Sequence, residues 1–294
     1  MLTSRVDELL AHGDVVPRPQ VSSVLAAWPF EPFVWLGLGL AAWWYLRTYS
    51  RVPAFPAVRR LHFMLGLAVA AVALASPIAI YEGALFWVHM VQHLLLVMVS
   101  APLLLLGAPV TLALRAASPA GRRRLLRVLH SKVVRVATHP VVAWSVFALV
   151  MWTVHFTSFY DLALENEVAH VAEHILFLSV AALFWWPVIG LDPTAARLGW
   201  PGRIAYVFLA MPQQSFLGVA IHQAKAPLYP HYATIERTWG PNPLADQQLA
   251  GTIMWVAGDF LFIGVLIFVV LAWMRHEQRA TRHLDRRLDA AARE

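Results

Sequence analysis

The sequence predicts an all-α membrane protein, a polytopic bundle of seven transmembrane helices, and three observations lead to that prediction: composition, hydropathy and the placement of basic residues. Of 294 residues, 59% are hydrophobic and only 14% are charged, and the mean hydropathy is +0.59. A soluble domain carries about 25% charged residues, which keep its surface wet. The deficit therefore indicates that much of the protein's outer surface faces lipid.

Seven stretches of the chain are long and apolar enough to cross a bilayer. A transmembrane helix needs roughly 20 mainly apolar residues, because each residue adds only about 1.5 Å of length. The stretches cover, in order, residues 30–49, 61–81, 84–107, 140–160, 170–190, 203–223 and 250–274.

The lysines and arginines predict which end of each helix faces the cytoplasm. If the N-terminus lies outside and the C-terminus lies in the cytoplasm, 19 of the 23 lysines and arginines fall on the cytoplasmic side. This asymmetry follows the positive-inside rule of membrane proteins. The net charge of +6 is then a consequence of topology, and nucleic acid is not an expected partner.

The same pattern divides the chain into three parts. Residues 1–29 form an extracytoplasmic N-terminal segment without the pattern of a cleaved signal peptide, 30–275 form the seven-helix domain, and 276–294 form a basic cytoplasmic tail. Within the domain, residues 115–138 are a basic cytoplasmic segment in which Ser118-Pro119 has the pattern of a helix start. Its apolar stripe predicts an amphipathic helix on anionic lipid headgroups, or alternatively a basic loop that only fixes topology.

Six of the thirteen histidines fall near the outer ends of the predicted helices. His89 with His93, and His170 with His174, are spaced i,i+4, so each pair shares one helix face. Ionisable groups within a membrane span are costly and usually face the bundle interior. The six are His89, His93, His155, His170, His174 and the less certain His222.

Further polar or sulfur-bearing side chains accompany this histidine layer. Met151 precedes His155 by one helical turn, and Glu173 lies beside His174. Asp259 ends a polar stripe that enters the last helix. Each of these side chains is a possible additional ligand, or a group that orients a ligand from behind.

The absence of cysteine leaves a metal site to His, Met, Asp and Glu. His170-Val-Ala-Glu173-His174 fits the HxxEH pattern of zinc peptidases, in which the glutamate activates water. One histidine from each of two helices, such as His93 and His174, could instead ligate a b-type haem. Copper suits imidazoles with nearby methionines, and histidines without any metal could simply hydrogen-bond between helices. Spacing alone leaves these alternatives open.

Several motifs, in order along the chain, resemble the CtaG family of cytochrome c oxidase assembly proteins. They begin at His89-Met-Val-Gln-His93 and continue through Ala101-Pro-Leu-Leu-Leu-Leu-Gly-Ala-Pro109. The others are His155-Phe-Thr-Ser-Phe-Tyr-Asp161, His170-Val-Ala-Glu-His174, Phe184-Trp-Trp-Pro187 and Asp246-Gln-Gln-Leu-Ala-Gly-Thr-Ile-Met-Trp255. The resemblance covers roughly residues 30–275.

The resemblance implies a non-enzymatic protein of the bacterial plasma membrane that helps to mature the haem–copper oxidase and acts around delivery of its copper. Cytochrome c oxidase subunits are the implied partners. The implied ligands are the five principal histidines of the layer, with Asp246 and Gln247 in support. On this basis copper is the expected metal, held in an outward-facing histidine cluster as by a metallochaperone.

Overall fold

The computed structural model describes residues 18–19, 28–193 and 196–291, with side chains described up to residue 282. Helices account for nearly all regular structure in these ranges, as the sequence predicts. They are α3 (Pro32–Tyr49), α4 (Ala57–Ala75), α5 (Pro77–Tyr81), α6 (Phe86–Leu94), η1 (Leu95–Ser100), α7 (Ala101–Leu106), α8 (Pro109–Ala116), α9 (Pro119–Leu129), α10 (Lys132–Ala137), α11 (Pro140–His155), α12 (Phe159–Glu165), α13 (Glu167–Ile189), α14 (Trp200–Gln223), α15 (Pro230–Thr234), α16 (Pro243–Thr252), η2 (Ile253–Ala257) and α17 (Gly258–Ala291).

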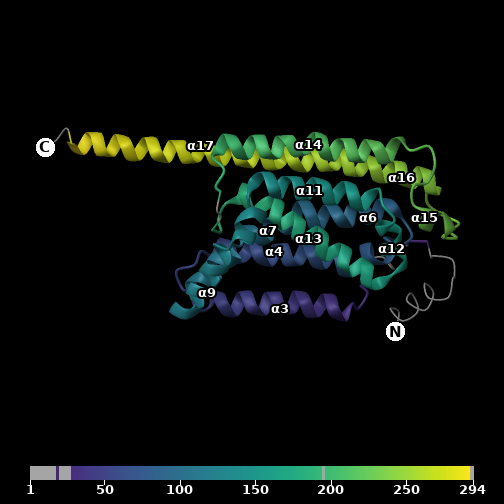
Figure 1. Cartoon of the computed structure of the whole chain (residues 1–294), viewed down its shortest axis with the longest axis horizontal. Helices are drawn as coiled ribbons and strands as arrows, with labels where there is room; N and C mark the ends of the chain where they lie inside the picture. The colour runs from purple at the N-terminus through teal and green to yellow at the C-terminus, as the bar shows by residue number, and fades with distance from the viewer. Residues whose placement is uncertain (1–17, 20–27, 194–195, 292–294) are drawn as a thin grey trace.

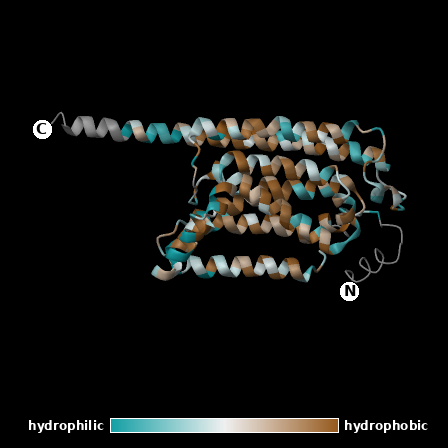
Figure 2. Ribbon diagram, viewed as in Figure 1, coloured by the Kyte–Doolittle hydropathy of each residue, from teal (hydrophilic) through white to brown (hydrophobic). Residues whose placement is uncertain are grey.

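The long helices lie side by side in one bundle, and α17 projects far beyond one end of it (Figure 1). Their middles are apolar, whereas polar residues gather toward the ends (Figure 2). Large apolar side chains such as Phe33, Leu149 and Phe268 point outward, while His89, Gln92 and Glu173 are buried inside. A polar interior under an apolar exterior is the arrangement that a bilayer requires, so the all-α membrane bundle is confirmed.

Five helical stretches in the described ranges are long and apolar enough to cross a membrane, or six if α11 and α12 form one bent span. The first predicted span, residues 30–49, corresponds to α3, which has 18 residues and is not among them. The count of seven spans, and the sides on which the termini lie, therefore stay predictions.

Several boundaries differ from the predicted ones. The fourth span is straight only to His155, after which the chain bends by 66° into α12. The last span begins at Pro243 rather than near residue 250, since Asn242 caps it by accepting a hydrogen bond from the Ala245 amide. The first 29 residues fall mostly outside the described ranges.

The basic segment 115–138 folds as two short helices instead of one. The Ser118 side chain accepts from the Gly121 amide and caps α9, which bears out the predicted helix start. Ser131 caps α10 in the same way, through the Val134 amide. The predicted contact of this segment with anionic lipids remains an expectation.

Two π-helical segments, η1 and η2, interrupt the third and last long helices. Such segments are rare and frequently lie at functional sites. Side chains from neighbouring helices support the first of them, because the Trp185 indole donates to the Val97 carbonyl at 2.8 Å. A pair of glycines brings α14 close to the helix that contains η2, since a Cβ on Gly251 would lie 2.6 Å from the Gly218 carbonyl oxygen. Small residues at such crossings allow helix backbones to approach closely.

Candidate metal-binding site

Four of the predicted histidines meet between α6 and α13. Within each helix, the ring centroids of His89 and His93 lie 4.1 Å apart, and those of His170 and His174 lie 4.3 Å apart. Across the helices, His89 is 5.9 Å from His170 and His93 is 6.0 Å from His174. The i,i+4 spacing thus puts two imidazole pairs face to face, as expected from helix geometry.

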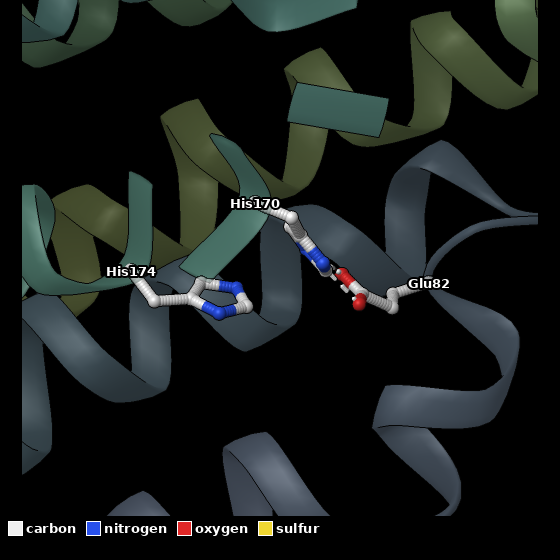
Figure 3. Close-up of side chains that lie close together, drawn as sticks. All are labelled: Glu82, His170 and His174. Atoms are coloured by element: carbon white, nitrogen blue, oxygen red, sulfur yellow. Dashed lines mark hydrogen bonds and ion pairs between the residues drawn. The ribbon is translucent and has the colours of Figure 1, made fainter. Parts of the chain in front are cut away.

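Glu82 joins this cluster from the turn between α5 and α6. Its carboxylate lies 3.1 Å from His170 Nε2 and 3.0 Å from His89 Nδ1, and Figure 3 shows the His170 ring directed at it. Burial alone would raise the pKa of Glu82, but the imidazoles of His170 and His89 hold that pKa well below its ordinary value. Glu82 therefore carries a negative charge at the entrance of the cluster. Ligand atoms of Glu82, His170 and His174 lie within 4.8 Å of one another.

Gln92 fixes the orientation of His174. The Gln92 amide nitrogen donates to the Ala73 carbonyl at 3.0 Å, so its oxygen faces His174 Nε2, 2.9 Å away. Since that oxygen can only accept, Nε2 carries the proton and the neutral ring has its lone pair on Nδ1. A partner of this kind behind an imidazole is usual at metal sites, because it sets the tautomer and the ring direction.

A second group, His89, His93 and Glu173, also has ligand atoms within 4.8 Å of one another, and all three residues are buried. His89 Nε2 lies 3.8 Å from the Glu173 carboxylate. Both nitrogens of His93 and both oxygens of Glu173 lack a hydrogen-bond partner. A buried polar group without a partner costs about 1–3 kcal/mol, so this group fits an interior built to receive a cation.

His155 lies outside these two groups, and its ring stacks on Phe177, which also packs against His93. Its Nδ1 lies 2.7 Å from the Met151 carbonyl, to which it donates. The lone pair of the neutral ring is then on Nε2, which is buried and has no partner. Met151 and His155 are thus coupled through the backbone, as well as by their shared helix face.

The supporting residues suggested by the resemblance lie away from the imidazoles. The buried Asp246 carboxylate accepts from the Phe86 and Trp87 amides and from Arg237, at 3.1–3.2 Å. Gln247 accepts from the Leu228 amide at 2.7 Å. Asp246 therefore caps the helix that carries His89 and His93, and Gln247 holds the connection before α15.

His222 and Asp259 are not brought into the cluster. His222 Nδ1 donates to the Gln248 carbonyl at 2.9 Å and lies 3.0 Å from the Thr252 hydroxyl. Asp259 accepts from the Ser215 hydroxyl at 2.9–3.0 Å. Both side chains tie α14 to the last helix.

Sequence reasoning missed Glu82 and Gln92. Gln92 directly precedes His93. Glu82 is a single carboxylate between two apolar stretches, and that position is the signal that could have identified it.

The connection before α16 covers this end of the bundle, since the Tyr232 hydroxyl donates to the Glu82 carbonyl and the Tyr229 hydroxyl donates to the His155 carbonyl. His170 keeps a quarter of its side chain exposed and lines a surface pocket of about 290 Å³ together with Glu82. This pocket brings the Glu82 and His170 side of the cluster to the protein surface.

The geometry of the cluster fits the three predicted metal chemistries, a hydrolase, a haem and a copper or zinc ion, to different degrees. In an HxxEH hydrolase the glutamate serves the metal held by its two histidines, whereas Glu173 here lies with His89 and is fully buried. A haem between His93 and His174 would need room for a porphyrin, but His93 packs against His89 at 4.1 Å and against Phe177 at 4.5 Å. Imidazoles with carboxylates, and no thiolate, suit copper or zinc.

Comparison with known proteins matches most of the chain to one family. The model described as cytochrome c oxidase caa3 assembly factor matches residues 39–276. Uncharacterized proteins of Mycobacterium bovis and Mycobacterium tuberculosis are each 32% identical over 292 residues, which covers 95% of this chain and 44% of theirs. A Mycobacterium leprae relative is 30% identical over the same shares. The chain thus spans less than half the length of these relatives, and no solved structure matches it.

Proposed function

This chain belongs to the caa3 cytochrome c oxidase assembly factors, and we propose that it carries copper as cargo and presents it to an oxidase subunit. The ion is received at Glu82 and His170 and held among the four clustered imidazoles. The protein acts as a metallochaperone, and the chemistry of electron transfer stays with the oxidase. Its place is the plasma membrane, with the cluster on the outer side.

One observation carries the proposal: buried imidazole nitrogens and carboxylate oxygens without hydrogen-bond partners face one another across α6 and α13. A structural network of histidines would satisfy these atoms with hydrogen bonds. Two carboxylates, Glu82 and Glu173, offset the charge of a cation in an interior that would otherwise repel it. The family supplies the reason to choose copper over zinc.

Metal analysis of the purified full chain in detergent tests the proposal. After loading with Cu(II) and removal of free ion, the wild type is expected to retain copper, whereas His89→Ala and His174→Ala retain much less. His62→Ala is the matched control, because His62 lies on α4 away from the cluster and also has a buried, unpartnered nitrogen. Circular dichroism identifies any variant that fails to fold.

Equal copper in wild type, His89→Ala and His174→Ala would contradict the site, as would a wild type that retains none. Glu173→Gln keeps the shape of the side chain and removes only its charge, so it tests the site even if the alanine variants fail to fold. It is expected to fold and to hold copper more weakly. In cells, the same variants are expected to lower the copper content of the oxidase while oxidase subunits still copurify with the protein.

A further inference from the structure

A small cavity lies deeper in the bundle, next to His93. Four methionines line it from four elements, α6, η1, α11 and η2, and their side chains are almost completely buried. Its volume is about 20 Å³, which is room for one water-sized particle. The lining side chains that carry metal-ligating sulfur or nitrogen atoms are Met90, Met98, Met151, Met254, His93 and His155.

The concentration of methionine is one mark of this cavity. The chain has eight methionines, and half of them line a space that admits one small particle. Met98 lies in η1 and Met254 lies in η2, so each π-helical segment contributes one thioether. Methionine often fills gaps in apolar cores. Apolar packing alone, however, does not explain why an imidazole with a free lone pair lines the same cavity.

His155 provides that lone pair. Because Nδ1 donates to the Met151 carbonyl, Nε2 of the neutral ring is an acceptor without a proton. Nε2 is buried and unpartnered, and the residue lines the cavity. His93, whose two nitrogens are also unpartnered, lines the same cavity from the side of the four-histidine cluster.

We propose that this cavity is a second metal site, selective for Cu(I), which receives the ion from the outer cluster through His93. Thioether sulfur is a soft ligand that prefers Cu(I), whereas the carboxylates of the outer cluster favour harder ions. The ion enters and leaves as Cu(I), so its oxidation state does not change. Ligands exchange one at a time: His93 binds the ion while an outer ligand still holds it, and the thioethers with His155 then replace the outer ligand.

The inference rests on the proposed function for the identity of the cargo, but its own test is separate. The purified full chain in detergent is titrated with Cu(I) without oxygen, in competition with a chromophoric Cu(I) chelator. Met98→Leu with Met254→Leu removes two thioethers and conserves volume, a change that cores usually tolerate. We expect this double variant to bind Cu(I) at least roughly tenfold more weakly, and to bind Cu(II) as the wild type does. Met211→Leu is the matched control, since Met211 packs against the same core but does not line the cavity.

X-ray absorption at the copper edge gives the second readout. Sulfur scattering in Cu(I)-loaded wild type, lost in the double variant and retained in Met211→Leu, supports the cavity as the site. Unchanged Cu(I) affinity in the double variant overturns the inference, and so does a wild-type spectrum with nitrogen and oxygen scattering alone. In both cases retained Cu(II) leaves the proposed function standing, whereas a wild type that binds neither ion contradicts both.

Discussion

Asp246 holds the histidine-bearing helix in place, and replacing it with alanine tests that role. Its carboxylate is fully buried and accepts three hydrogen bonds, from the Phe86 and Trp87 amides and from Arg237. Loss of a helix cap typically costs about 0.5–2 kcal/mol. Removal of one partner of a buried ion pair costs about 3–5 kcal/mol, because the other charge is left uncompensated. Arg237 has only 5% of its side chain exposed, so we expect Asp246→Ala to lower the free energy of unfolding by about 3–5 kcal/mol.

Unfolding in a graded detergent mixture, followed by circular dichroism, measures this change. Asp246→Asn is the matched control, since the amide oxygen can still accept from one amide of α6 and the loss should be smaller. A double-mutant cycle with Arg237→Ala isolates the ion pair: the double variant is expected to cost less than the two single costs together. A loss below about 1 kcal/mol in Asp246→Ala, or strict additivity in the cycle, would refute the reasoning.

Three further changes have expected outcomes. Gly251→Ala places a Cβ 2.6 Å from a backbone carbonyl oxygen of α14 and should lower the unfolding free energy by about 1–3 kcal/mol; Gly264→Ala, with open space around it, should leave that free energy equal or raise it in the same assay. Gln92→Leu removes the acceptor that orients His174 and should weaken Cu(II) binding by roughly 10–100-fold in a competition titration without unfolding the protein; unchanged affinity would show that the ring needs no such partner. Glu82→Gln keeps the shape of the entrance but removes its charge, so we expect slower Cu(II) uptake in stopped-flow measurements, with an effect that shrinks as salt is added.

The helical architecture and much of the cluster follow from the sequence because both depend on short-range periodicity. An i,i+4 pair must share a helix face, and two such pairs at one depth meet if their helices are neighbours, as His89 with His170 shows. Glu82 was not predicted because it lies in a turn, where periodicity gives no direction for a side chain. His222 was predicted from its depth and Asp246 from the family resemblance, but neither says whether a polar group faces a metal or a backbone amide.

The methionine cavity is beyond sequence reasoning for a different reason. A π-helical turn accommodates one extra residue, which rotates the face of everything after it by roughly 100°. Met98 and Met254 lie within η1 and η2, and spacing along each helix cannot show that both residues line one cavity with Met90 and Met151. Only the packed structure reveals that these side chains turn inward to one space.

The contrast among the imidazoles bears on how an ion could move inward. In His155, His170 and His174, one nitrogen is held by a carbonyl, a carboxylate or an amide oxygen, so each ring presents its other nitrogen in one fixed direction. His93 is held by no such bond, and its ring can turn without breaking one. It also borders both the outer cluster and the methionine cavity. A ligand that can turn between two fixed sets of ligands lowers the barrier to moving the ion from one set to the other, because no hydrogen bond is lost when the ligand turns. A fixed imidazole at the same position would favour retention of the ion over its delivery.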